Sequence, residues 1–126
     1  MRTTLVIEKN DLARDTFMRV IGQQSPVKGA KTLEIAETQL ALRQDIGLVL
    51  CCIRLPDGLG HKLHQRIAHR LSLDGIQWLA MSADWEYDLH RPAREYYQAA
   101  GVPMVYKKDL KPLALFALVR NHLPPD

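Results

Sequence analysis

Cysteine is scarce in this sequence of 126 residues: only Cys51 and Cys52 are present, and they are adjacent. Two neighbouring thiols cannot link distant segments, so we expect no disulfide framework and a reducing, cytoplasmic setting. No apolar run approaches the roughly 18 residues that a membrane-spanning helix requires. The first apolar segment turns acidic at Glu8, which is not the pattern of a signal peptide.

An excess of one charge sign is also missing. Lysine and arginine number 17 against 14 acidic residues, a formal net charge of +3. That excess does not indicate nucleic acid binding, and the chain offers no separate recognition helix. Repeats and low-complexity tracts are absent too, and 47% hydrophobic with 25% charged residues is typical of one globular domain. We expect residues 1–123 to form this domain and 124–126 to be a tail, the start of a linker to an effector domain.

What is present is an alternation of short apolar segments with helical patterns. The apolar segments predict five strands, at residues 3–7, 27–30, 46–53, 76–81 and 102–106. Apolar residues spaced three or four apart follow each of them, and Pro92 and Pro112 are well placed in the first turns of the last two helices. This alternation predicts a doubly wound α/β domain, in which helices cover both faces of a five-stranded parallel sheet.

The predicted architecture also places a candidate site. In open α/β sheets the ligand crevice lies beyond the carboxyl ends of the strands, near the topological switch point. The residues at those ends are Glu8, Lys9, Cys52, Arg54, Ser82, Lys107 and Lys108. Their side chains would bring carboxylate, thiol, hydroxyl and basic groups to one edge of the sheet.

Four segments at these strand ends resemble, in their order and spacing, the receiver domain of bacterial two-component response regulators. They are residues 5–10, 45–58, 80–83 and 100–108. The resemblance covers essentially the whole chain and implies the flavodoxin-like, CheY-like fold. In receivers an acidic pair and an aspartate hold Mg²⁺, and the aspartate accepts a phosphoryl group from a kinase histidine. A Ser or Thr hydroxyl and a lysine meet the phosphoryl oxygens.

By this resemblance the chain retains part of the phosphorylation pocket. Glu8 stands at the first acidic position, and Ser82 stands at the hydroxyl position. Lys108 is the expected lysine, with Lys107 as the alternative if the register differs by one residue. Asp109 follows, where the family usually has a proline.

Two departures from the family decide the predicted function. Cys52 stands at the phosphoacceptor position, and Lys9 replaces the second acid. A thiol cannot form an acyl phosphate and is a poor ligand for Mg²⁺, which prefers oxygen. An ammonium beside a divalent cation is strongly repelled, since even two unit charges about 4 Å apart interact by roughly 4 kcal/mol at an effective dielectric constant of 20. We therefore predict a pseudo-receiver that is not an enzyme, binds Mg²⁺ weakly or not at all, and acts by phosphorylation-independent protein–protein interaction.

Three alternatives stay open at this point. Cys52 could be a redox-sensing thiol if a nearby lysine lowers its pKa. Asp57, the nearest carboxylate to the acceptor position, could accept phosphate, although it follows Pro56 in a turn and is expected to point away from the pocket. An enzyme of the flavodoxin type is a weaker alternative, because the first strand-to-helix turn lacks a phosphate-binding loop rich in Gly, Ser and Thr.

An aromatic surface is the expected site for a protein partner. The segment 84–91 is longer than the corresponding receiver loop and, with its neighbours, contributes Trp85, Tyr87, Tyr96 and Tyr106. Aromatic side chains are enriched at protein interfaces. The resemblance implies a histidine kinase, an effector domain or another signalling protein as the partner, and a homodimer is a further candidate.

Three histidines share the helix predicted after the turn at 54–58. They are His61, His64 and His69, and no acidic or cysteine ligand accompanies them at the spacing of a metal site. We therefore expect these side chains on the solvated face of the helix.

Overall fold

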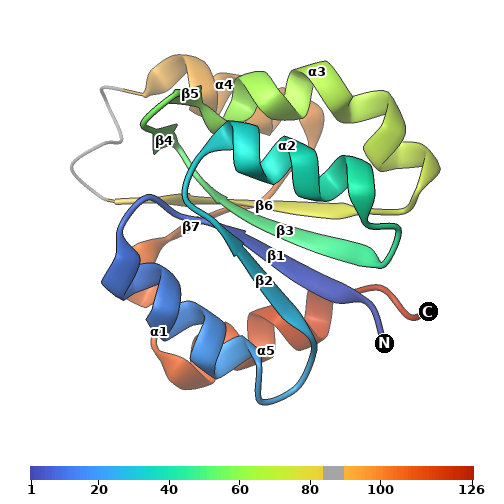
Figure 1. Ribbon diagram of the computed structural model, residues 1–126. Coiled ribbons are helices and arrows are strands. Elements are labelled where there is room, and N and C mark those ends of the chain that lie inside the picture. The colour runs from blue at the N-terminus through green and yellow to red at the C-terminus, as the bar shows by residue number, and fades with distance from the viewer. Residues whose placement is uncertain (84–89) are drawn as a thin grey trace.

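Strands and helices alternate along the chain in the computed structural model, which describes residues 1–83 and 90–126 (Figure 1). The strands are β1 (Thr3–Ile7), β2 (Val27–Ala30), β3 (Ile46–Cys52), β4 (Arg54–Leu55), β5 (Gly58–Leu59), β6 (Gln77–Ser82) and β7 (Met104–Tyr106). The helices are α1 (Asp11–Ile21), α2 (Leu33–Leu42), α3 (Gly60–Leu73), α4 (Arg91–Ala100) and α5 (Pro112–His122), with a 3₁₀ turn, η2 (Lys107–Asp109). Among the helices of these residues, none is long and apolar enough to cross a bilayer.

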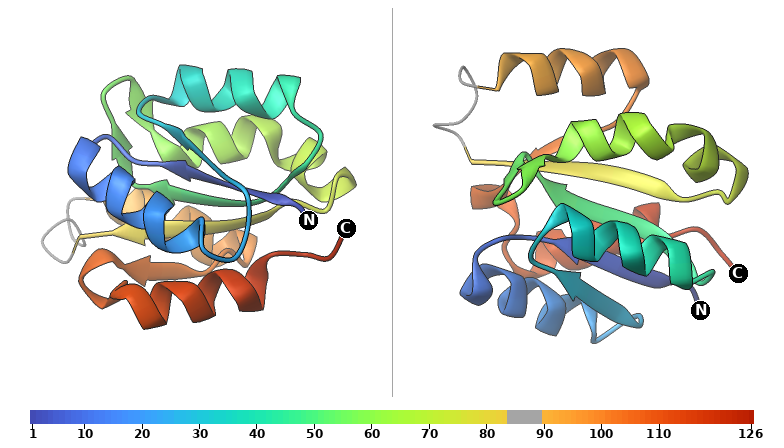
Figure 2. Two further views of the ribbon diagram at one scale, coloured as in Figure 1. Left: turned by 60° about the horizontal axis from the view of Figure 1, so that its bottom comes forward. Right: turned by 45° about the horizontal axis from the view of Figure 1, so that its top comes forward.

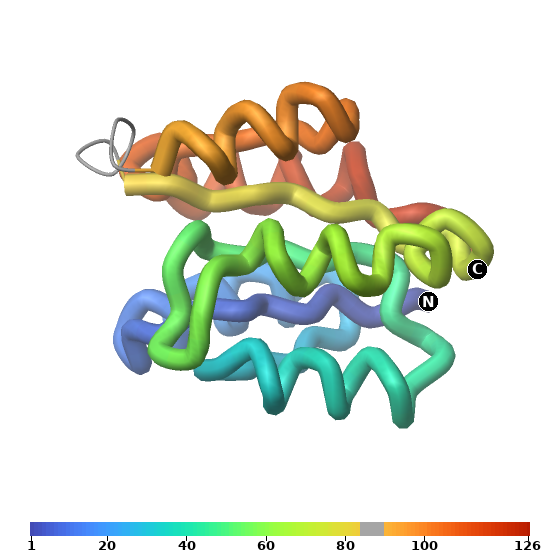
Figure 3. Tube along the Cα trace, turned by 90° about the horizontal axis from the view of Figure 1, so that it is seen from above, coloured from blue at the N-terminus to red at the C-terminus, as the bar shows by residue number. Residues whose placement is uncertain are grey.

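Five parallel strands form the main sheet in the order β2-β1-β3-β6-β7. The switch point lies between β1 and β3, because the chain leaves β1 toward β2 on one side and returns to β3 on the other. Helices α1 and α5 cover one face of the sheet, and α2, α3 and α4 cover the other (Figures 1 and 2). Seen from above, the latter three lie in a row (Figure 3). The predicted fold class, a doubly wound five-stranded parallel sheet, is confirmed.

Local sequence explains where the elements begin and end. Asn10 Oδ1 accepts a hydrogen bond from the Ala13 N–H at 2.8 Å, so the turn after β1 caps α1. Thr32 Oγ1 caps α2 in the same way. Every residue of β3 is buried, which accounts for its continuous apolar sequence. Pro92 lies in the first turn of α4, as predicted.

Two segments differ from the sequence-based expectation. The turn expected at residues 54–58 is part of a short hairpin, in which β4 and β5 pair antiparallel. Gly58 allows this hairpin because its φ of +145° is unfavourable for other residues. The last strand begins at Met104 rather than at residue 102, because Pro103 has no N–H to donate to a neighbouring strand.

The prediction that three histidines of α3 face solvent is wrong for two of them. His61 and His64 are only 4% and 8% exposed, whereas His69 is exposed. The pattern of α3 gives the reason: His64 lies three residues before Ile67 and seven before Leu71, on the apolar stripe that faces the core.

Candidate functional site

The carboxyl ends of the central strands lie side by side at one edge of the sheet. Adjacent strands pair Ile7 with Cys51, Cys52 with Met81, and Ser82 with Tyr106. Glu8 directly follows β1, and Lys107 directly follows β7. The strand-end residues predicted from the sequence therefore gather at one edge, beside the switch point where α/β sheets bind ligands.

Glu8 is a fully buried charge at this edge, with 0% exposure. Its Oε2 accepts a hydrogen bond from the Asn10 N–H at 3.1 Å, and its Oε1 lies 2.8 Å from Nζ of Lys107. A buried carboxylate without a compensating cation costs several kcal/mol, so this ion pair makes the burial of Glu8 tolerable. The structure thus brings Lys107, the alternative lysine of the sequence analysis, to Glu8. Lys108, the lysine first expected, instead has its Nζ 5.8 Å from the ring centroid of Tyr106.

Lys9 and Cys52 converge on a single backbone carbonyl. Lys9 Nζ donates a hydrogen bond to the carbonyl oxygen of Arg54 at 3.3 Å, and Cys52 Sγ donates to the same oxygen at 3.4 Å. Because β4 begins at Arg54, both side chains hold the short hairpin against the strand ends. The Arg54 side chain itself is exposed.

Lys9, which stands at the second acidic position of the resemblance, therefore donates its ammonium hydrogen bond to a backbone carbonyl. The hydroxyl position is also engaged: Ser82 is buried, and its Oγ donates to the carbonyl oxygen of Ala83 at 3.0 Å.

Burial keeps both thiols protonated. Burial, with a smaller contribution from the Glu8 carboxylate, raises the pKa of Cys52 to about 11, although Lys107 and Lys9 act in the opposite direction. Burial also raises the pKa of Cys51 well above its ordinary value. The thiolate is the species that oxidants attack, and about one Cys52 in a thousand would carry it near pH 8. This environment weighs against the redox-sensing alternative.

Asp57 points away from the pocket, as expected. Its Oδ1 accepts a hydrogen bond from the Leu33 N–H at 2.8 Å, and its Oδ2 accepts from the Glu34 N–H at 3.0 Å. Burial raises the pKa of the Asp57 carboxyl, but these two hydrogen bonds, together with one from its own backbone N–H, outweigh that effect and hold the pKa below its ordinary value. Asp57 is therefore a helix-capping residue of α2, which weighs against its use as a phosphoacceptor.

The donor set at this edge does not suit the Mg²⁺ that the resemblance implies. Mg²⁺ prefers several oxygen ligands in octahedral geometry. Here the Glu8 carboxylate is already neutralised by Lys107, Lys9 adds a second ammonium, and Cys52 offers a protonated thiol. In residues 1–83 and 90–126, no three His, Cys, Asp or Glu side chains are grouped so that they could hold a metal ion.

Of the four aromatic residues expected at a partner surface, the structure describes only Tyr96 and Tyr106. Trp85 and Tyr87 lie outside the described residues. Tyr96 is half-buried on α4, where its hydroxyl lies 2.6 Å from Nδ1 of His64, so it belongs to the packing between α3 and α4. Tyr106 is exposed at the end of a groove between α4 and β7.

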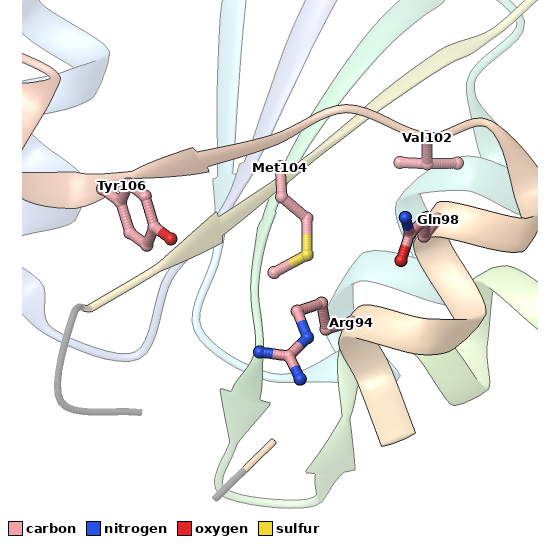
Figure 4. Close-up of a pocket in the computed structure, with 5 residues that line it drawn as sticks. All are labelled: Arg94, Gln98, Val102, Met104 and Tyr106. Carbon is pink, nitrogen blue, oxygen red and sulfur yellow. The ribbon is translucent and has the colours of Figure 1, made fainter. Parts of the chain in front are cut away.

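This α4–β7 groove has a volume of about 300 Å³ (Figure 4). Its lining residues are Arg94, Gln98, Val102, Met104 and Tyr106. Figure 4 shows Met104 and Tyr106 on the strand side and Arg94 on the helix side. The groove therefore combines an apolar thioether and an aromatic ring with a guanidinium, the mixture that protein interfaces favour.

No protein-family model matches the sequence, and no curated protein matches it either. Solved structures do match. A CheY-like response regulator receiver domain from Methanospirillum hungatei JF-1 has a TM-score of 0.82 at 18% identity, over 98% of this chain and 94% of that chain. The signal receiver domain of an HD domain-containing protein from Pseudomonas fluorescens Pf-5 has a TM-score of 0.81 at 15% identity, over 97% and 94%. A CheY-like receiver domain from Methylobacillus flagellatus has a TM-score of 0.76 at 17% identity, over 96% and 98%.

This chain has the receiver fold. One side chain at this edge of the sheet, that of Arg14, was not predicted from the sequence. Its Nη1 donates a hydrogen bond to the carbonyl oxygen of Glu8 at 2.8 Å, and its Nη2 lies 2.6 Å from Asp11 Oδ1. The spacing of three residues between Asp11 and Arg14 in the first turn of α1 is the signal that could have indicated an ordered arginine there.

Proposed function

We propose that the protein is a pseudo-receiver, a signalling domain that does not accept phosphate by the standard route and acts by binding another protein. The observation that carries the proposal is the ion pair between Lys107 and the buried Glu8. This ammonium already supplies the positive charge that a divalent cation would otherwise bring to the carboxylate. Mg²⁺ would have to displace or approach Lys107 and also tolerate Lys9, so we propose that its binding is weak or lost.

The acceptor position supports the same proposal. Cys52 is a buried, protonated thiol that donates to the carbonyl oxygen of Arg54, and it has no carboxylate oxygen that could form an acyl phosphate. The nearest carboxylate in the sequence, Asp57, caps α2. With neither metal ligands nor an acceptor, the domain has no catalytic role in this proposal.

The absence of phosphate transfer can be tested on the intact protein. After incubation with Mg²⁺ and a small-molecule phosphodonor such as acetyl phosphate, we expect the mass to remain that of the unmodified chain. A receiver with the full acidic set, treated in parallel, serves as the positive control. A stable increase of about 80 Da on this chain, the mass of one phosphoryl group on an acceptor oxygen, would contradict the proposal.

We propose the α4–β7 groove as the surface for the protein partner. It lies on an edge of the sheet, and it contains the exposed Tyr106 beside Met104 and Arg94. Aromatic, methionine and arginine side chains together are the composition enriched in interface centres. A signalling protein or a second copy of this chain are the partners that the receiver fold suggests.

The partner surface can be tested with a photo-crosslinking amino acid. Placed at Gln98, which is exposed and lines the groove, the crosslinker is expected to yield a protein adduct in cells. Placed at Leu42, 78% exposed at the far end of α2, it serves as the matched control and should yield none. Equal adducts from both positions, or an adduct from Leu42 alone, would contradict the assignment of this groove.

A further inference from the structure

Five side chains form a cluster of rings between α3, α4 and β6, called here the ring cluster. Its members are His61, His64, Trp78, Tyr96 and Tyr97. Six pairs of these rings have centroids between 5.1 and 6.3 Å apart. Two polar contacts tie the cluster together: His64 Nδ1 lies 2.6 Å from Tyr96 Oη, and Trp78 Nε1 donates to Tyr97 Oη at 3.2 Å.

The ring cluster is a main attachment of α4 to the rest of the domain. The buried residues of α4 are Ala93 and Tyr97, and Tyr96 is half-buried beside them. Since Ala93 offers little apolar surface, the two tyrosines supply most of the packing on this side of the helix. Both tyrosines contact the imidazoles of His61 and His64, so α4 depends on the state of these rings.

The surroundings of His61 in particular disfavour a second ring proton. His61 Nδ1 is buried and has no hydrogen-bond partner in the described part of the chain, so an N–H at this atom would lack an acceptor. His61 and His64 lie in the first two turns of α3, at the positive end of its dipole. Aromatic rings attract cations, but this attraction is weaker than the hydration that a buried imidazolium loses.

The charged groups around the ring cluster also disfavour a charged imidazolium there. Burial lowers the pKa of His61 and His64, and the charges of Lys62 and His90 lower that of His61 further. On the same two helices, Arg66, Arg91 and Arg94 add cations, and Glu95 is the exposed acid. From β3, Cys51 approaches Gly60 at the start of α3 as a neutral thiol. Segment 84–89 lies outside the described residues.

We propose that the ring cluster is a proton-sensitive lock on α4. With neutral imidazoles α4 packs against α3, and entry of a proton at His61 or His64 opens this contact. The lock does not depend on the proposed lack of phosphorylation. It would alter the α4–β7 groove, however, because α4 carries Arg94 and Gln98.

The direction of the pH dependence follows from linkage. A histidine whose pKa is lower in the packed state than its ordinary value of 6.5 contributes full stability above pH 6.5 and loses it as the pH falls below that value. Each such histidine reduces the ratio of locked to open molecules by up to about tenfold per pH unit below 6.5. Two of them would reduce it by up to about thirtyfold between pH 6.5 and 5.5, because each is already half-protonated in the open state at pH 6.5.

Nuclear magnetic resonance from pH 8 to pH 5 tests the lock on the wild-type protein. We expect the His61 and His64 rings to titrate below pH 6.5, and the amides of α4 to lose hydrogen-exchange protection over the same range while β1 and β3 stay protected. The variant His69→Gln, altered at an exposed position of α3, should behave as the wild type. The double variant His61→Phe/His64→Gln should keep α4 equally protected at pH 5 and pH 8.

Three results would overturn the proposal. The first is titration of both rings at or above pH 6.5. The second is unchanged protection of α4 down to pH 5 in the wild type, and the third is an acid opening of α4 that persists in the double variant. If the double variant does not fold, the first two measurements on the wild type still decide.

Discussion

Replacing Lys107 with methionine is expected to lower the free energy of unfolding by about 3–5 kcal/mol. The substitution keeps the apolar stem of the side chain but removes the ammonium that lies 2.8 Å from Glu8 Oε1. Glu8 is fully buried, so its carboxylate would remain as an uncompensated buried charge at this edge of the sheet. Urea denaturation followed by circular dichroism at pH 7.5 measures the change.

A neighbouring lysine provides the matched control. Lys108→Met alters an exposed residue and should change the free energy of unfolding by about 0.5 kcal/mol or less. The double variant Glu8→Gln/Lys107→Met removes both charges and should recover much of the loss, because no buried charge is left alone. A loss as large in Lys108→Met as in Lys107→Met would contradict the pairing of Glu8 with Lys107.

Truncating Tyr97 to alanine is expected to cost about 3–5 kcal/mol, because a fully buried ring would leave a cavity between α4 and the sheet. The Trp78 N–H would also lose its partner, the Tyr97 hydroxyl. Urea denaturation again measures the loss. Hydrogen exchange should show the amides of α4 as the first to lose protection.

Two further tyrosine variants show how much of this loss comes from the hydroxyl and how much depends on burial of the ring. Tyr97→Phe keeps the ring and should cost about 1–2 kcal/mol, the expected loss for one unpaired buried donor. Tyr106→Ala removes an exposed ring and should cost less than about 1 kcal/mol. If Tyr97→Ala were no more destabilising than Tyr106→Ala, the ring cluster would not be the anchor of α4.

The fold could be predicted from the sequence because its signals are repeated along the chain. Strand-forming apolar segments alternate with helical spacing five times, and β3 is apolar throughout because it is covered on both faces. The caps at Asn10 and Thr32 and the prolines of α4 and α5 fixed most helix starts. The short hairpin of β4 and β5 could not be predicted, because two-residue strands have no periodicity.

The site could be predicted only at the level of strand ends. The topology of parallel sheets places Glu8, Cys52 and Ser82 together, whatever their side chains do. The choice between Lys107 and Lys108 depends on the 3₁₀ turn after β7, and the sequence offers two adjacent lysines without a signal for that turn. The buried imidazoles were missed because a histidine on an apolar stripe has the same spacing as a core residue but the polarity of a surface one.

A titration with beryllofluoride, which mimics the phosphoryl group, tests the central claim most directly. In the presence of Mg²⁺, backbone amide resonances are followed by NMR at the strand ends, around Cys52, Ser82 and Lys107. We expect no shifts beyond those that Mg²⁺ or fluoride causes alone, because a protonated thiol stands at the acceptor position and Lys107 already pairs with the Glu8 carboxylate. Saturable shifts at these residues would show that the edge binds the phosphoryl mimic, and the proposal of a phosphorylation-independent domain would be wrong.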